Sequence, residues 1–290
     1  WWALIRSSGW KDISFRAQVE GARCLSGATQ HGLRVTGRSS GRLTAGCAPP
    51  QAFGTTPWLN FMAMHFPNLP ERVAEIRGLL AAAAARGGHG QAVKLVAVTK
   101  THGPEAAIEA WEAGVPDCGE NKVQEALGKM GQVGVPVVWH LIGHLQRNKV
   151  HELEHFALLH SLDSRRLADA VCEFGLKRKR AVDALIQVNA SGEVSKGGFS
   201  PEELRAEADR LTGMPGIRVV GAMTMAPLDA SELVLRQTFA GARHARQVLA
   251  DAGHPATELS MGMSNDYEIA AEEGATLVRL GTALFGARDL

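Results

Sequence analysis

The sequence predicts an α/β protein built as a single (β/α)8 barrel, and three observations lead to this fold class. Short apolar runs alternate strictly with helix-length segments from about residue 93 onward. Eight such strands fall within roughly 200 residues, a length in which parallel βα units close into a barrel. The main alternative is an open doubly wound sheet, which loses support because no Gly-x-Gly-x-x-Gly follows the first strand.

Local signals define the first helix, the first strand and one later helix. Pro70 suits the first turn of a helix over 70–86, which Gly87-Gly88 ends. A strand is predicted over 93–99, because residues 93–98 form an aliphatic run interrupted only by Lys94, as in a strand buried on both faces. Residues 200–203 (SPEE) form a capping box, which predicts a helix start there. The other predicted strands are 117–119, 136–142, 157–162, 184–188, 217–223, 258–261 and 276–280, with helices at 104–113, 120–130, 146–156, from 164, from 231, at 265–273 and at 283–285.

Residues 1–61 are left out of the fold argument. Their first 60 residues hold seven Arg or Lys against two acidic residues, and no sustained hydrophobic period runs through them. They read as an organelle transit peptide, as a disordered basic tail, or as a segment upstream of a true start at Met62 or Met64. We favour the last interpretation because the chain has no initiator Met. We therefore expect a poorly ordered or non-native extension at 1–61 and the barrel at 62–290.

Composition narrows the class of protein. The net charge of +1 gives no support for nucleic-acid binding or for a membrane surface. No apolar run is long enough to span a bilayer. The four cysteines lie far apart without a CxxC pair, which argues against a metal cluster and against a disulfide framework. The expected location is a reducing compartment, the cytoplasm, or an organelle if residues 1–61 are a genuine transit peptide.

Lys100 directly follows the first buried strand. In a barrel the active site lies at the carboxyl ends of the strands, so this lysine is expected at the mouth of the barrel. Burial favours the neutral amine, which is the nucleophilic form needed for a Schiff base. The alternative is a lysine whose stem packs while its ammonium group reaches solvent.

Small and hydroxyl-bearing residues follow strands seven and eight. Gly262 lets a ligand approach the backbone, and Ser264 supplies a hydroxyl at a helix start, a pattern typical of phosphate sites. Gly281 and Thr282 are expected beside them, where barrels often bind phosphate. The alternative is that Ser264 or Asn265 only caps the following helix.

Two further polar features stand near the strand ends. Arg279 lies inside an apolar strand and needs a partner, either an acid such as Glu120 or Asp163, or a ring atom or anion in the barrel mouth. His140 and His144 are four residues apart across a strand end, a spacing that fixes no metal geometry. No third ligand is evident, and no metal site is expected.

Taken together, a lysine after strand one, a phosphate cup after strands seven and eight and an arginine on strand eight form a recognisable set. From Met62 to Leu290 the chain resembles the YggS/PROSC family of pyridoxal phosphate homeostasis proteins. Residues 1–61 have no counterpart in that pattern. The motifs that carry the resemblance are residues 96–100 (VAVTK), 119–121 (GEN), 139–149 (WHLIGHLQRNK), 260–266 (SMGMSND) and 278–286 (VRLGTALFG).

The resemblance implies a barrel like the amino-terminal domain of alanine racemase, with pyridoxal 5'-phosphate (PLP) as cofactor. Lys100 would carry PLP as a Schiff base, and Arg279 would face the pyridine nitrogen, which leaves the ring a weaker electron sink than an aspartate would. His144 and Asn265 depart from the residues frequent in the family, proline and aspartate. The remaining implied contacts are Ser264, Gly281 and Thr282 to the phosphate, with Gly262, Asn121, Met223 and Ser260 around the cofactor and Lys196 either near the ring hydroxyl or on the surface.

The function that the resemblance implies is a monomeric carrier or regulator of intracellular PLP without robust catalysis, with apo PLP-dependent enzymes as candidate recipients. Alanine racemase carries a second domain that completes its site, whereas this chain ends after the barrel and has a single tyrosine, Tyr267. The alternative is a fold-type III amino-acid racemase, which needs a second acid/base group such as His140 or Lys196. A cofactor-free Schiff-base aldolase is a third hypothesis.

Overall fold

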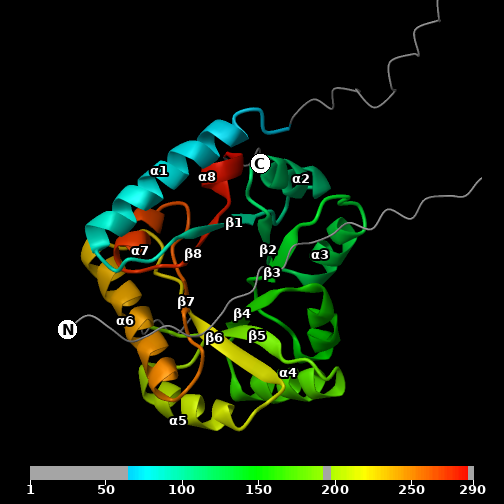
Figure 1. Cartoon of the computed structure of the whole chain (residues 1–290), viewed down its shortest axis with the longest axis vertical. Helices are drawn as coiled ribbons and strands as arrows, with labels where there is room; N and C mark the ends of the chain where they lie inside the picture. The colour runs from blue at the N-terminus through cyan, green and yellow to red at the C-terminus, as the bar shows by residue number, and fades with distance from the viewer. Residues whose placement is uncertain (1–64, 192–196, 287–290) are drawn as a thin grey trace, which may run out of the picture. The chain divides into compact units, whose positions relative to one another are not determined.

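The structure, a computed structural model, describes residues 65–191 and 197–286 of the chain. Eight parallel strands close into a barrel in which each strand pairs with the next and β8 pairs with β1 (Figure 1). The predicted (β/α)8 barrel is confirmed. The predicted boundary at residue 61 and the predicted loop residue Lys196 lie outside the described residues.

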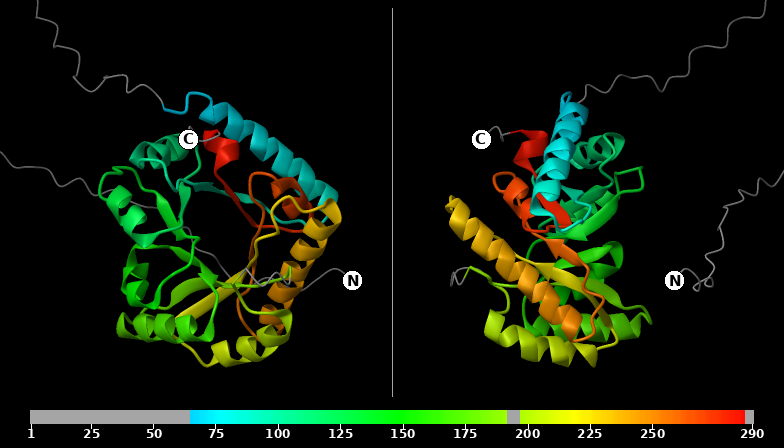
Figure 2. Two further views of the ribbon diagram at one scale, coloured as in Figure 1. Left: turned by 180° about the vertical axis from the view of Figure 1, so that it is seen from behind. Right: turned by 60° about the vertical axis from the view of Figure 1, so that its left-hand side comes forward.

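The helices lie on the outer side of the ring of strands, and the view from behind shows the same arrangement (Figure 2). The strands are β1 Lys94–Val98, β2 Asp117–Glu120, β3 Val138–Leu141, β4 Leu158–Leu162, β5 Val182–Gln187, β6 Ile217–Met223, β7 Glu258–Ser260 and β8 Leu277–Leu280. The helices are α1 Leu69–Gly87, α2 Pro104–Glu112, α3 Val123–Met130, the 3-10 helix η1 Arg147–His155, α4 Arg165–Lys177, α5 Pro201–Thr212, α6 Glu232–Asp251, α7 Tyr267–Glu272 and α8 Thr282–Phe285.

The predicted capping box at the start of α5 is confirmed. The Glu203 amide N–H donates to Ser200 Oγ (3.3 Å), and the Ser200 amide N–H donates to Glu203 Oε2 (3.0 Å). Pro201 occupies the first turn, where its missing N–H leaves no hydrogen bond unmade. The two reciprocal bonds satisfy backbone donors that a helix start would otherwise leave free.

Two predicted helices differ in the structure. The segment predicted as an α-helix over 146–156 is the 3-10 helix η1. Its two buried apolar residues, Val150 and Leu153, are three apart, which matches the three-residue turn of a 3-10 helix. The helix predicted from 120 begins at Val123, because Glu120 pairs with Leu141 and extends strand β2.

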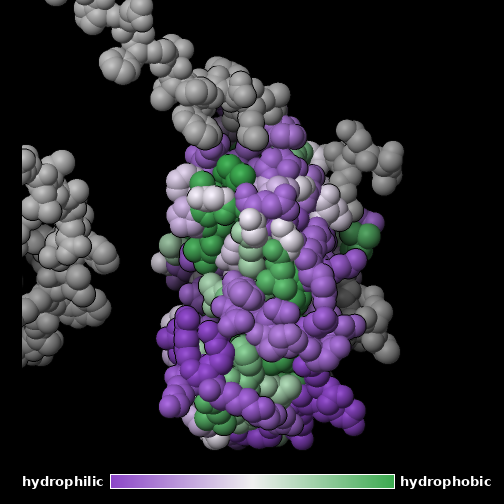
Figure 3. Space-filling view, turned by 90° about the vertical axis from the view of Figure 1, so that its right-hand side faces the viewer, coloured by the Kyte–Doolittle hydropathy of each residue, from purple (hydrophilic) through white to green (hydrophobic). Residues whose placement is uncertain are grey.

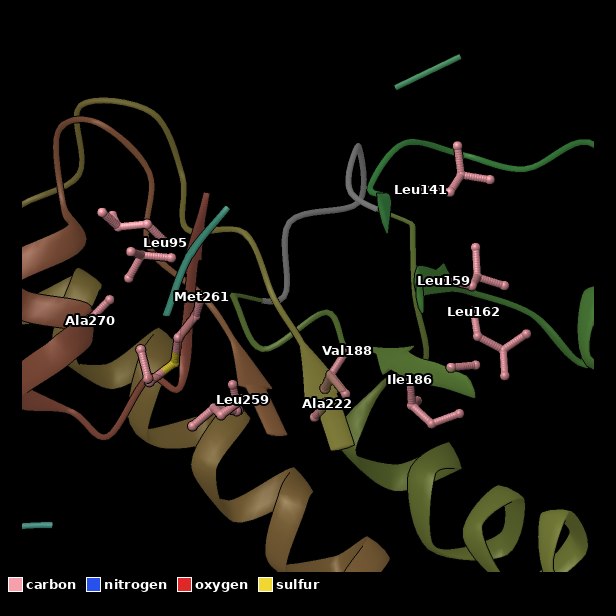
Figure 4. Packing of buried hydrophobic residues seen from close by; sticks show 14 of the residues in the cluster. Leu95, Leu141, Leu159, Leu162, Ile186, Val188, Ala222, Leu259, Met261 and Ala270 are labelled. Atoms are coloured by element: carbon pink, nitrogen blue, oxygen red, sulfur yellow. The ribbon is translucent and has the colours of Figure 1, made fainter. Parts of the chain in front are cut away.

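Apolar side chains pack on both sides of the strands. The larger cluster fills the space between the barrel and its helices, and Figure 4 shows part of it, including Leu141, Leu159 and Leu259. A smaller cluster lies inside the barrel. Its members alternate along their strands with the outward residues, as period-two geometry requires, and are Val96, Leu158, Leu185, Met223 and Leu277.

The outer surface of the barrel carries mixed chemistry. On the face shown in Figure 3, hydrophobic residues form separate patches among hydrophilic ones. None of the helices in residues 65–191 and 197–286 combines the length and apolar character needed to traverse a bilayer.

Candidate functional site

A cavity of about 720 Å³ opens where the strands end, within the size range of small-molecule sites. Its walls come from the segments that follow most of the strands, so residues far apart in sequence share it. Six of the nine predicted site residues line it together, namely Lys100, Asn121, Ser264, Arg279, Gly281 and Thr282. The lining also includes apolar residues such as Val98, Ile142 and Met263.

Lys100 is half-buried, and the backbone on both sides of it is held by α3. Lys129 Nζ donates to the Thr99 carbonyl oxygen (2.6 Å), and the Thr101 amide N–H donates to Glu125 Oε1 (2.5 Å). Thr101 has φ +68°, a conformation that disfavours a β-branched residue and needs such support. Lys129 was not predicted, although its position on the apolar face of α3, three residues after Ala126, was a signal.

Lys129 is a buried cation that also neutralises Glu120. Lys129 Nζ lies 2.7 Å from Glu120 Oε1, and that oxygen accepts a 2.6 Å hydrogen bond from Thr99 Oγ1. Burial raises the pKa of the Glu120 carboxyl, against the hydrogen bonds from Lys129 and Thr99. Glu120 therefore points from β2 toward α3 and away from the cavity.

The two loops predicted to hold phosphate are joined directly. The Ala283 amide N–H, in the first turn of α8, donates to Ser264 Oγ (3.2 Å). The expected proximity of Ser264 to Gly281 and Thr282 is therefore present. The residue at the N-cap of α7 is Asp266, so the alternative that Ser264 or Asn265 caps this helix is wrong.

Gly262 has a structural reason for being glycine. Its φ is +93°, and an added Cβ would lie 2.6 Å from Ala270 Cβ. The residue thus allows α7 to pack against the strand end. Its predicted role beside a ligand stays a prediction.

Arg279 is buried and contacts neutral oxygens. It donates through Nη1 to Ser260 Oγ (2.6 Å) and through Nη2 to the Thr224 carbonyl oxygen (3.0 Å). The alternative that Arg279 forms an ion pair with Glu120 or Asp163 is wrong, because Glu120 faces Lys129 and Asp163 faces His144. Burial lowers the pKa of Arg279 to about 10, with the charge of Asp266 acting in the opposite direction. The guanidinium therefore remains charged at neutral pH.

Two predicted residues lie in the barrel interior. Met223 packs with the inner apolar cluster, and Ser260 contacts Arg279 from beneath the cavity. His140 is also interior, with one ring nitrogen 3.0 Å from Asp117 Oδ1 and the other 2.9 Å from His160 Nε2. His160 was not singled out from the sequence, although a histidine among the leucines of β4 was a visible signal.

His144, rather than His140, is the histidine that lines the cavity. Its Nδ1 lies 2.7 Å from Asp163 Oδ2, and its side chain is 70% exposed. Gly143 brings this loop close to its neighbour, since an added Cβ would lie 2.3 Å from the Asn121 carbonyl oxygen. Among the residues that the structure describes, no group of three or more His, Cys, Asp or Glu could hold a metal ion.

Comparison with known proteins bears on this site. The alanine racemase N-terminal domain family matches residues 80–289. A pyridoxal phosphate homeostasis protein of Pseudomonas aeruginosa is 41% identical over 224 residues, covering 76% of this chain and 96% of that protein. One of Aquifex aeolicus is 40% identical over 225 residues, covering 76% of this chain and 99% of its own length.

The chain belongs to the pyridoxal phosphate homeostasis protein family. A similar solved structure is that of PipY from Synechococcus elongatus with PLP bound. It shares 36% identity and a TM-score of 0.66, covering 75% of this chain and all of that one. The resemblance inferred from the five sequence motifs is confirmed. The family match also confirms the predicted likeness to the amino-terminal domain of alanine racemase.

Proposed function

We propose that this protein binds PLP as a Schiff base on Lys100 and serves in intracellular PLP homeostasis. The observation that carries the proposal is the shared cavity, where a half-buried lysine, a buried arginine and the joined loops of Ser264 and Gly281 converge. The relatives' names and the PLP-bound PipY structure support the same ligand.

The chemistry of the cavity fits PLP. An amine is required for the aldehyde, and Lys100 supplies it. A phosphate requires hydrogen-bond donors and room near the backbone, which the Ser264 hydroxyl, Gly281 and Thr282 supply. A flat aromatic ring requires apolar walls, and Val98 is among the apolar lining residues.

The other predicted cofactor contacts lie either in the cavity wall or beneath it. Asn121 and Arg279 line the cavity and are proposed to contact the ring. Ser260 and Met223 are proposed to act from beneath, because Ser260 orients Arg279 and Met223 fills the inner barrel. Gly262 is proposed to shape the phosphate loop through its positive φ.

When bound, PLP would supply an electron sink for amino-acid chemistry, and a cationic arginine beside its ring nitrogen restrains that chemistry. We infer a carrier or regulator in the cytoplasm rather than a robust enzyme. Apo PLP-dependent enzymes are the proposed recipients, and a monomer is the proposed form. The names of the curated relatives support a role in homeostasis.

The alternative is a fold-type III amino-acid racemase, which needs a second acid/base group at the cavity. His140 is a poor candidate for that acid/base group, because both of its ring nitrogens have partners inside the barrel. His144, backed by Asp163, is the better candidate on geometry. Racemisation across a panel of amino acids that vanishes on His144→Ala would favour the enzyme, and no racemisation would favour the carrier.

The decisive experiment is the absorbance spectrum of the purified protein with PLP, before and after Lys100→Ala. The expected result is a yellow Schiff-base band that the substitution removes. Lys129→Arg is a useful comparison, because it keeps a cation near Thr99 and leaves Lys100 in place. A wild-type protein without the band would overturn the proposal, and a band that survives Lys100→Ala would move the attachment point elsewhere.

A further inference from the structure

A continuous chain of polar side chains crosses the barrel interior and ends at Arg279. Arg279 Nη1 lies 2.6 Å from Ser260 Oγ, and Ser260 Oγ lies 2.9 Å from His160 Nδ1. His160 Nε2 lies 2.9 Å from His140 Nδ1, and His140 Nε2 lies 3.0 Å from Asp117 Oδ1. All five side chains are at least nine-tenths buried.

Strand register shows that these side chains face inward. In neighbouring parallel strands, paired residues point to the same side of the sheet. Arg279 pairs with Val96 and His140 pairs with Leu158, both of which belong to the inner apolar cluster. His160 lies two residues after Leu158 and faces the same way. A polar chain thus replaces part of the branched aliphatic filling that is usual inside such barrels.

The donor and acceptor inventory allows all four hydrogen bonds to run in one direction. Arginine can only donate and an ionised carboxylate can only accept, so the bonds can all run from Arg279 to Asp117 when each histidine carries one ring proton. Ser260 accepts from Arg279 and donates to His160 Nδ1. His160 Nε2–H then donates to His140 Nδ1, and His140 Nε2–H donates to Asp117. Both imidazoles are neutral in this arrangement, and every bond of the chain has one donor and one acceptor.

The groups at the two ends support this direction. Burial alone would raise the pKa of Asp117, but the hydrogen bond from His140 and the nearby Lys94 ammonium hold that pKa below its usual range. Asp117 is therefore an ionised acceptor at neutral pH. At the other end Arg279 keeps its charge and contacts only neutral oxygens in its two direct hydrogen bonds.

The separation between the charges of Arg279 and Asp117 affects the charge that the cavity presents. A carboxylate in direct contact would neutralise Arg279, whereas here two imidazoles and a hydroxyl separate the charges. The guanidinium stays cationic where it faces the cavity, and a cation beside a pyridine nitrogen disfavours protonation of that nitrogen. The two bonds to Ser260 and Thr224 also restrict how the guanidinium can turn.

We propose that Asp117, His140 and His160 are positioning residues that act through Ser260 to hold Arg279 as a cationic donor toward the ring nitrogen of bound PLP. This inference rests on the proposed function. Through Arg279, the polar interior of the barrel keeps the ring nitrogen of PLP unprotonated.

The test is the 15N NMR shift of ring-labelled PLP bound to the wild type and to His160→Leu, with the PLP dissociation constant measured beside it. We expect His160→Leu to retain the Schiff-base band on Lys100. Its ring-nitrogen signal should move toward the protonated position, and its dissociation constant should rise about tenfold, the cost of one misplaced charge-assisted hydrogen bond. Leu185→Ala is the matched control, because it opens a cavity in the same interior and removes no polar group of the chain. It should lower stability and leave the ring-nitrogen signal unchanged.

A second variant covers the case in which His160→Leu does not fold. Ser260→Ala breaks the chain by removing one hydroxyl and should shift the ring-nitrogen signal in the same direction. If both variants leave that signal and the dissociation constant as in the wild type, the inference is wrong while the proposed function stands. If the wild type shows no Schiff-base band, the proposed function itself fails. Guanidinium NMR signals of Arg279 in the PLP-free protein give an independent reading, since a broken chain should speed their hydrogen exchange.

Discussion

Lowering the pH should destabilise this protein because His160 is held neutral inside the barrel. Burial, together with the neighbouring His140 and the positive charge of Arg279, lowers the pKa of His160 well below its usual value of about 6.5. His160 therefore stays unprotonated in the folded state at a pH where it binds a proton in the unfolded chain. Acid then favours the unfolded state.

The size of the effect follows from proton linkage. A histidine in the unfolded chain takes up its proton near pH 6.5, so stability is complete above that pH and falls below it, by up to about 1.4 kcal/mol per pH unit. Because burial holds the folded pKa well below 6.5, the loss attributable to His160 reaches up to about 2 kcal/mol at pH 5. Asp117 acts in the same direction only below about pH 4, where its own unfolded carboxyl titrates.

The measurement is urea unfolding of the PLP-free protein at about pH 7.5 and about pH 5, for the wild type and His160→Leu. The wild type should lose about 2 kcal/mol more than the variant between the two pH values, whatever the variant's absolute stability. Because His140 contacts His160, the difference reports on the coupled pair.

An exposed histidine provides the control. His89 is exposed in the loop after α1, and His89→Ala should leave the pH-dependent loss as it is in the wild type. The reasoning would be refuted if His160→Leu lost as much stability as the wild type. That result would mean that His160 can hold a proton in the folded barrel, and the direction assigned to the polar chain would fall with it.

Substitutions at three further positions have defined outcomes. Lys129→Met leaves Glu120 buried without its cation and should cost about 3–5 kcal/mol in urea unfolding, whereas Lys129→Arg should cost less. Ser200→Ala removes the capping box and should lower the unfolding free energy by about 1 kcal/mol without changing PLP affinity. Gly143→Ala forces a Cβ against the Asn121 carbonyl and should weaken PLP binding about tenfold by fluorescence titration; unchanged affinity would show that this loop does not shape the site.

Much of the scaffold was predictable because it depends on local rules. Alternating strand and helix lengths imply parallel βα units, and eight of them close into a barrel, as observed. The same rule predicts that residues after successive strands share one cavity. Lys100, Ser264 and Gly281 meet there although more than 160 positions separate Lys100 from Ser264. An α-helix was predicted over 146–156, but the buried side chains there are three residues apart, and the segment forms a 3-10 helix.

The sequence by itself therefore determined the fold class, the lysine at the first strand end and the pairing of the loops after strands seven and eight. Only the tertiary structure decided which polar residues contact one another. The bond between His140 and His160 joins positions 20 apart, and the bond between His160 and Ser260 joins positions 100 apart. Alternation tells which residues face inward, but strand register and closure of the barrel set which inward residues touch. For that reason the partner of Arg279, the role of Lys129 and the choice of His144 over His140 at the cavity emerged only from the folded barrel.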